Sequence, residues 1–140
     1  MSGSGGGRVR DAMITEPWSL PASASVREAG VELSPPEVRA VYVVDDDGAL
    51  IGVVTRKTLV ARAVAKGLDP TTTSVGEIAE APHYTIEADT PLDAAFRFLE
   101  EQDAERVPVI EHGRLVGVLS RSVLQRRLAE DEEPSGPVEE

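Results

Sequence analysis

Residues 50–56 read LIGVVTR, and residues 115–121 read LVGVLSR. Each stretch is a short apolar run that ends at a hydroxyl residue, which a basic residue follows at once. The apolar run is typical of a buried β-strand, and the hydroxyl residue is typical of the N-cap of a helix. Because the same pattern occurs twice in the chain, we expect two copies of one structural unit.

The rest of each copy aligns outward from these two stretches. Residues 66 positions apart match in type: Val9 with Val75, Trp18 with Tyr84, Leu20 with Ile86, Leu33 with Leu99, and Val43 with Val109. The turn at 111–113 is one residue shorter than its counterpart at 45–48, and the spacing is 65 from there on, as in Thr55 and Ser120. A single deletion in a surface turn is what a duplicated sequence should accumulate.

Local signals divide the first copy into elements. Ser25 and Glu28 form a capping box that predicts the start of a helix. The apolar runs 41–44 and 50–54 flank an Asp-rich turn with a glycine, which predicts a β-hairpin. Thr55 then begins a helix that Gly67 ends.

The second copy repeats these signals. Ser74 and Glu77 form another capping box, and Pro91 stands where a helix favours proline, at its first position. Each copy thus predicts strand, helix, strand, strand, helix. We expect an α/β (α+β) fold of two tandem β-α-β-β-α units related by pseudo-twofold symmetry, with Leu33 and Leu99 at equivalent buried positions.

Composition sets the domain organisation. We expect a flexible Gly/Ser linker at 1–8, a first unit at 9–67, a loop at 68–73, a second unit at 74–130 and a disordered acidic tail at 131–140. The tail region holds several acids and no base.

The chain of 140 residues has a formal net charge of −11 and no cysteine. It shows no dense basic run, which argues against nucleic-acid binding. The apolar runs are too short for a membrane span, and no signal peptide is expected at the start. The lack of cysteine excludes disulfides and thiolate metal sites and fits a cytoplasmic location.

Three motifs of the second copy occur in a characteristic order: TPLDAA at 90–95, RVPVI at 106–110 and LVGVLSR at 115–121. Together with the duplication they resemble a tandem pair of CBS domains, or Bateman module, over residues 9–128. The resemblance implies a stand-alone regulatory protein and not an enzyme. It implies an adenosine-containing ligand, such as AMP, ADP, ATP or S-adenosylmethionine, in clefts between the units, and it implies a homodimer.

The resemblance also implies site residues. One cleft would use Thr55, Arg56 and Thr58 with Tyr84, Thr85, Arg106 and Pro108. The other would use Ser120, Arg121 and Val123 with Trp18, Ser19 and Arg39. The family's ribose-binding aspartate is replaced by Thr58 in one unit and by Val123 in the other. Adenine nucleotides should therefore bind weakly and chiefly through phosphate, better at the Thr58 cleft, and Thr58→Asp should tighten AMP binding.

Each of these residues also has a purely structural interpretation. Thr55 and Ser120 can act as N-caps alone, or can also help to bind phosphate. Arg56 and Arg121 can contact phosphate or simply be solvated. Trp18 and Tyr84 can stack on a base or pack between the units. His83 and His112 are expected to be exposed, and no catalytic or metal-binding constellation stands out.

Two function classes remain. In the first, the chain senses an adenine nucleotide or a similar phosphate-bearing ligand and signals to a protein partner. In the second, it has lost the ligand and serves as a structural dimerisation or docking module. The helix carrying Leu59, Val60, Ala63 and Val64 and the helix carrying Leu124 and Leu128 are the candidates for the dimer contact.

Overall fold

The computed structural model describes residues 7–15 and 19–132, and these form two compact units. The first, which we call the four-stranded unit, is made of residues 7–15, 84–111 and 116–132. The second, which we call the three-stranded unit, is made of residues 19–83 and 112–115. Trp18, a predicted site residue, lies outside the described residues, as does the end of the predicted tail at 133–140.

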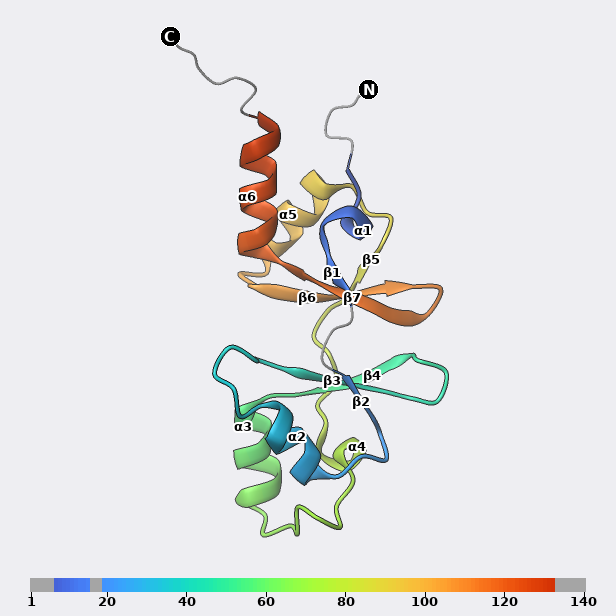
Figure 1. Cartoon of the computed structure of the whole chain (residues 1–140), viewed down its shortest axis with the longest axis vertical. Coiled ribbons are helices and arrows are strands. Elements are labelled where there is room, and N and C mark those ends of the chain that lie inside the picture. The colour runs from blue at the N-terminus through green and yellow to red at the C-terminus, as the bar shows by residue number, and fades with distance from the viewer. Residues whose placement is uncertain (1–6, 16–18, 133–140) are drawn as a thin grey trace. The chain divides into compact units, whose positions relative to one another are not determined.

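The sheet of the four-stranded unit has the order β1-β7-β6-β5. Its strands are β1 (Ile14–Thr15), β5 (Ile86–Glu87), β6 (Arg106–Glu111) and β7 (Arg114–Ser120). The helices of this unit are α1 (Val9–Ala12), α5 (Leu92–Glu101) and α6 (Arg121–Glu132), and they cover one face of the sheet (Figure 1). Leu99, Val107 and Leu119 are fully buried in the core between sheet and helices.

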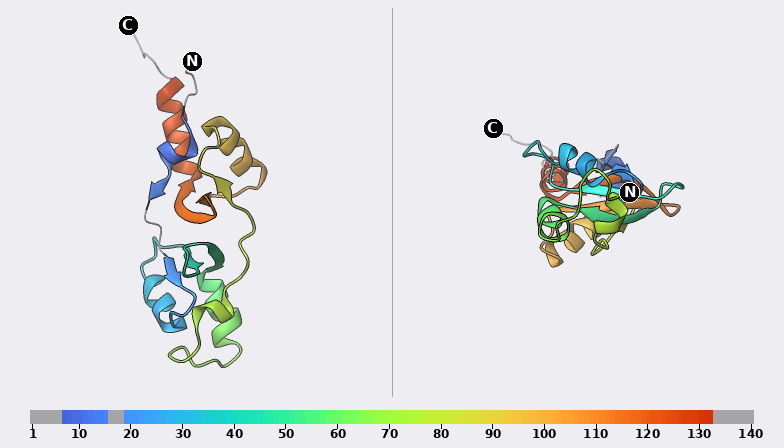
Figure 2. Two further views of the ribbon diagram at one scale, coloured as in Figure 1. Left: turned by 90° about the vertical axis from the view of Figure 1, so that its right-hand side faces the viewer. Right: turned by 90° about the horizontal axis from the view of Figure 1, so that it is seen from below.

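The sheet of the three-stranded unit has the order β2-β3-β4. Strand β2 (Ser19–Pro21) runs parallel to β3 (Val41–Val44), and β3 runs antiparallel to β4 (Leu50–Val54), as the predicted hairpin requires. The helices are α2 (Val26–Glu32), α3 (Arg56–Leu59), its π-helical continuation η1 (Val60–Val64) and α4 (Val75–Ile78). They too lie on one face of their sheet (Figures 1 and 2).

The predicted α/β class is confirmed. Leu33 and Leu99 are both buried, each at the end of the helix that packs on its own sheet. In the described part of the chain, no helix has the length and apolar character needed to cross a bilayer.

The compact units do not follow the sequence repeats, because each takes an edge segment from the start of the other repeat. Strand β1 pairs antiparallel with β7, with Ile14 opposite Val118. In the same way Glu80, which follows α4, forms a bridge with Val53 of β4. The predicted boundaries at 67 and 74 therefore separate the two repeats in the sequence only. In the structure, the first segment of each repeat packs in the unit formed mainly by the other repeat.

The glycine of each LxGVxx stretch permits this close pairing. A Cβ atom at Gly52 would lie 2.7 Å from the Cβ of Ala79, and one at Gly117 would lie 2.7 Å from the Sδ of Met13. Both distances are shorter than a Cβ atom can approach a non-bonded atom, so a side chain at either position would force its neighbours to move. The two glycines are thus required by the edge segments that they face.

The predicted caps and turns form with small shifts. Ser25 accepts a hydrogen bond from the backbone N–H of Glu28 at 3.1 Å, and Ser74 and Glu77 complete a capping box. Pro91 is the N-cap of α5, one position before the predicted one, as helix ends often differ by a residue. Helix α6 continues to Glu132, two residues into the predicted tail.

Candidate functional site

A hydroxyl cluster marks the start of α3. Strand β4 ends at Val54, and Thr55 is the N-cap of the helix that follows. The Thr55 side chain accepts from the backbone N–H of Thr58 at 3.3 Å, and the Thr58 hydroxyl accepts from the backbone N–H of Thr55 at 3.0 Å. The two hydroxyls are themselves 3.0 Å apart. The N-cap role predicted for Thr55 is therefore present.

Glu80 completes this cluster from a different part of the chain. Its backbone N–H and carbonyl bond to the carbonyl and N–H of Val53 at 2.9 and 2.8 Å, which fixes the residue beside the start of α3. The Thr58 hydroxyl donates to Oε2 of Glu80 at 2.9 Å. Thr58 is only 1% exposed, whereas Glu80 is half-buried. We call Thr55, Thr58 and Glu80 the Glu80 cluster.

The bonding capacity of Thr58 is fully used within this cluster. A hydroxyl has one proton and two acceptor lone pairs. The proton goes to Glu80, so the Thr55 hydroxyl must donate in the contact between the two threonines. Together with the Thr55 N–H, this fills both lone pairs of Thr58. In this arrangement Thr58 has no lone pair left to accept a bond from a ribose hydroxyl.

A looser counterpart stands at the start of α6. The hydroxyl of Ser120, which is buried, lies 3.4 Å from Oε2 of Glu105 and 3.1 Å from the hydroxyl of Ser122. The N–H of Val123 reaches the Ser120 hydroxyl at 3.5 Å, the limit of a hydrogen bond. Glu105 is exposed, and the side chain of Val123 adds no polar atom. The cap predicted for Ser120 is thus long and weak.

Sequence reasoning missed both glutamates. Glu80 occupies the repeat position of Ile14, which is 48% exposed, so the duplication gives no hint of a shared acid there. Glu105 lies in the loop before β6 and corresponds to Arg39. One signal could have pointed to Glu80. When the two repeats are aligned, this acid stands opposite the apolar residue Ile14.

Arg56 has a structural contact that the sequence did not predict. Its Nη2 donates to the carbonyl of Leu33 at 2.7 Å and to that of Pro35 at 2.8 Å. The guanidinium therefore ties the start of α3 to the carboxyl end of α2, where a cation is favourable. A phosphate contact from this nitrogen would require both bonds to break.

Arg121 is held less firmly. Its backbone N–H donates to the carbonyl of Glu105 at 2.7 Å, but Nη1 of its guanidinium lies 3.5 Å from Oδ1 of Asp103, and that carboxylate is 98% exposed. Surface pairs of this kind contribute little, about 0–1 kcal/mol. Arg121 can therefore leave this pair for an anion more easily than Arg56 can leave its carbonyls.

The other predicted site residues are distributed over the two units. Tyr84 packs edge-on against Phe98, with ring centroids 5.6 Å apart, so its ring is engaged inside the four-stranded unit. In the same unit Thr85 is exposed, Arg106 is half-buried and Pro108 is buried. Ser19 and Arg39 are exposed residues of the three-stranded unit. The two predicted clefts, which each draw on both units, stay a prediction.

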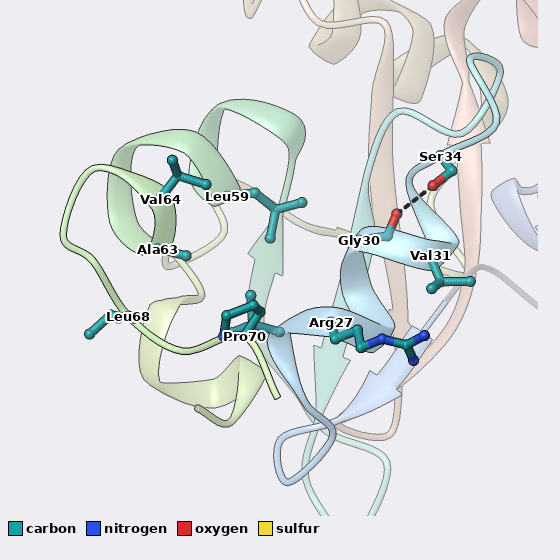
Figure 3. A pocket seen from close by; sticks show the side chains of 10 residues that line it. Arg27, Gly30, Val31, Ser34, Leu59, Ala63, Val64, Leu68 and Pro70 are labelled. Atoms are coloured by element: carbon teal, nitrogen blue, oxygen red, sulfur yellow. Dashed lines mark hydrogen bonds between the residues drawn. The ribbon is translucent and has the colours of Figure 1, made fainter. Parts of the chain in front are cut away.

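An apolar hollow of about 360 Å³ lies between α2 and the helical run of α3 and η1 (Figure 3). Val31 from α2 lines it on one side, and Leu59, Ala63 and Val64 from the run of α3 and η1 line it on the other. Val31, Val60 and Val64 are 57%, 60% and 73% exposed. We call these three valines the valine face.

The dimer surfaces predicted from sequence are only partly exposed. Val60 and Val64 point outward, but Ala63 belongs to the core of the three-stranded unit. Leu124 is fully buried in the core of the four-stranded unit, so its proposed role in a dimer contact is wrong. An apolar stripe on a helix has the same appearance whether it faces its own core or a partner.

Hydrogen bonds within the turn hold the Asp-rich hairpin turn in place. Asp45 Oδ1 accepts from the backbone N–H groups of Asp47 and Ala49 at 2.9 and 3.0 Å, and Gly48 has φ = 85°. These are the contacts of a hairpin turn. His83 and His112 are exposed, as expected. No group of three or more His, Asp or Glu residues in the described ranges is arranged to hold a metal ion.

The sequence comparison assigns the family. The family model of the CBS domain matches residues 9–65 and 75–130. The chain belongs to the CBS-domain family. The predicted tandem CBS pair is thereby confirmed. Hypoxic response protein 1 of Mycobacterium tuberculosis is 34% identical over 94 residues, or 67% of this chain and 66% of that protein. The match thus spans just under two thirds of the length of that relative.

Solved CBS structures share the fold. A crystal structure of CBSX2 in complex with AMP has a TM-score of 0.74 and 27% identity, and the match covers 91% of this chain and 100% of that one. CBSX2 is a CBS-pair protein of Arabidopsis thaliana. A crystal structure of hypoxic response protein I with two coordinated zinc ions has a TM-score of 0.73 and 28% identity. The match covers 86% of this chain and 98% of that one.

A third structure is similar in fold alone. The CBS domain pair of protein MJ0100, in complex with 5′-methylthioadenosine and S-adenosylmethionine, has a TM-score of 0.67 at 23% identity, and the match covers 90% of this chain and 98% of that one. Adenosine-containing molecules therefore occur as ligands of two of these CBS structures.

Proposed function

We propose that this CBS pair is a non-catalytic regulatory module of the cytoplasm that binds an adenine nucleotide and signals the binding to a protein partner. The Glu80 cluster carries the proposal. It places a carboxylate at the start of a helix, beside two hydroxyls, in a chain of the same family as CBSX2, which has been crystallised with AMP. The residues predicted to complete this site are Tyr84, Thr85, Arg106 and Pro108.

The test is calorimetry on the full chain with AMP, ADP, ATP and S-adenosylmethionine, with GMP and inorganic phosphate as controls. We expect saturable binding of at least one adenosine ligand and none of GMP. Mass spectrometry of nucleotide released from the purified protein by denaturation gives an independent measure. An absence of saturable binding by all four adenosine ligands would refute the proposal.

The alternative function, a docking module without a ligand, has less support. Its main argument is the lack of an aspartate at positions 58 and 123. The carboxylate of Glu80 lies within hydrogen-bonding distance of Thr58, so an acid is present where the first helix lacks one.

We further propose that two copies of the chain pair through the valine face. Val31 and Val64 line the apolar hollow, and Val60 is a further exposed valine of η1. Exposed apolar side chains of this kind are typical of an interaction surface. Light scattering should give the mass of a dimer for the wild type and of a monomer for Val64→Lys. Ile51→Lys is the matched control, since Ile51 is also exposed, at 47%, but lies on β4. A dimer that survives Val64→Lys would contradict this surface.

A further inference from the structure

We propose that the carboxylate of Glu80 recognises the ribose of the bound nucleotide, and that it is supplied by the segment after α4 and not by the helix that starts at Thr55. The inference rests on the proposed nucleotide-binding function and names the residue that decides its specificity. The ligand class is a nucleotide with both ribose hydroxyls.

The first step concerns acceptors in the cluster. Ribose presents two adjacent hydroxyl donors, which need acceptors. Thr58 has none left, because its two lone pairs receive the N–H and the hydroxyl of Thr55. Thr55 keeps one lone pair beyond the bond from the Thr58 N–H. The threonines alone therefore cannot bind both hydroxyls of a ribose.

Glu80 supplies the missing capacity. An ionised carboxylate offers about four acceptor sites on two oxygens. Thr58 occupies one site on Oε2, and among the described residues no group donates to Oε1. The remaining sites on the two oxygens are sufficient for two adjacent hydroxyls. A half-buried position strengthens such bonds, because they are partly shielded from water.

The position of this carboxylate is fixed on both sides. The backbone of Glu80 makes two hydrogen bonds to Val53, and Ala79 packs against the space left by Gly52. The bond from Thr58 then selects one orientation of the side chain. A preorganised acceptor loses little entropy when it binds, so it can discriminate well between ligands.

The corresponding place in the four-stranded unit is different. Ile14 stands at the repeat position of Glu80, and its side chain has no acceptor. Glu105 reaches Ser120 and Ser122 only at 3.4 Å and is exposed. We therefore infer one ribose-selective site per chain, in the three-stranded unit. Glu105, which makes only long contacts in the other unit, is the residue to substitute as a control.

The experiment compares AMP with 2′-deoxy-AMP and 3′-deoxy-AMP by calorimetry on the full chain. A hydrogen bond to a charged acceptor corresponds to about a 10- to 100-fold change in affinity. Wild type should prefer AMP over each deoxy analogue by about 10-fold or more. Glu80→Gln should weaken AMP by a similar factor and reduce the preference to about 1, whereas Glu105→Gln should leave both values unchanged.

A thermal unfolding curve shows whether each variant is folded, and Glu80→Asp, which keeps the charge on a shorter chain, should give an intermediate preference. The inference is overturned if Glu80→Gln keeps the preference for AMP, or if Glu105→Gln removes it. Equal binding of AMP and its deoxy analogues by the wild type overturns it too, while leaving nucleotide binding intact. If the wild type binds no adenosine ligand, the proposed function fails, and this inference fails with it.

Discussion

Thr58→Asp tests the Glu80 cluster most directly. The substitution restores the acid that the family resemblance implies at this position, and from sequence alone it should tighten AMP binding. In the structure, however, Oγ1 of Thr58 lies 2.9 Å from a carboxylate oxygen of Glu80. An aspartate there would place two carboxylates in contact and would remove the proton that Thr58 donates.

The magnitude follows from this distance. Two like charges about 4 Å apart repel by about 4 kcal/mol at an effective dielectric constant of about 20. One carboxyl of such a pair relieves part of the repulsion by binding a proton, since a neighbouring like charge raises its pKa. We expect Thr58→Asp to lower the free energy of unfolding by about 2–4 kcal/mol at neutral pH. The loss should shrink as the pH falls and the raised pKa is passed.

The assay is urea unfolding of four proteins: wild type, Thr58→Asp, Glu80→Gln and the double variant. The amide that Glu80→Gln introduces can donate to the new aspartate, so the double variant should be more stable than Thr58→Asp alone. Of the three variants, only the double variant should bind AMP more tightly than the wild type does. The reasoning is refuted if Thr58→Asp is as stable as wild type, or if the single substitution tightens AMP.

Three further predictions concern single contacts. Gly52→Ala should destabilise the fold by about 1–3 kcal/mol in urea unfolding, because its Cβ would lie 2.7 Å from another side chain, whereas Gly30→Ala in α2, with nothing within 4 Å of the new Cβ, should be stabilising. Arg56→Met should cost about 1–3 kcal/mol through its two lost carbonyl bonds but leave AMP affinity nearly unchanged in calorimetry, and a large loss of affinity would reassign Arg56 to the ligand. The N–H and hydroxyl of Thr71 lower the pKa of Asp69, so the stability they confer is present above the unfolded pKa and lost as pH falls through the folded one; Thr71→Val should raise that pKa in a carboxyl NMR titration, and an unchanged value would contradict the contact.

Much of the fold was determined by the sequence itself. The duplication, the hairpin of β3 and β4 and the caps at Ser25, Thr55 and Ser74 were all predicted, and the structure contains them. These features depend on residues within a few positions of one another, and so their signals are local. The CBS resemblance was also contained in the order and spacing of short motifs, and the family match confirms it.

The tertiary structure decided which groups meet at the candidate site. Glu80 reaches Thr58, 22 positions away, only because its backbone pairs with β4. Arg56 finds the carbonyls of α2 by a contact over 23 residues, which the residue's own neighbourhood does not encode. Leu124, predicted for an interface, is buried in its own unit. A periodic apolar pattern indicates that one face of a helix is covered, and a buried charged residue indicates that it has a partner. Which segment covers the face, and which group is the partner, depends on how distant parts of the chain pack.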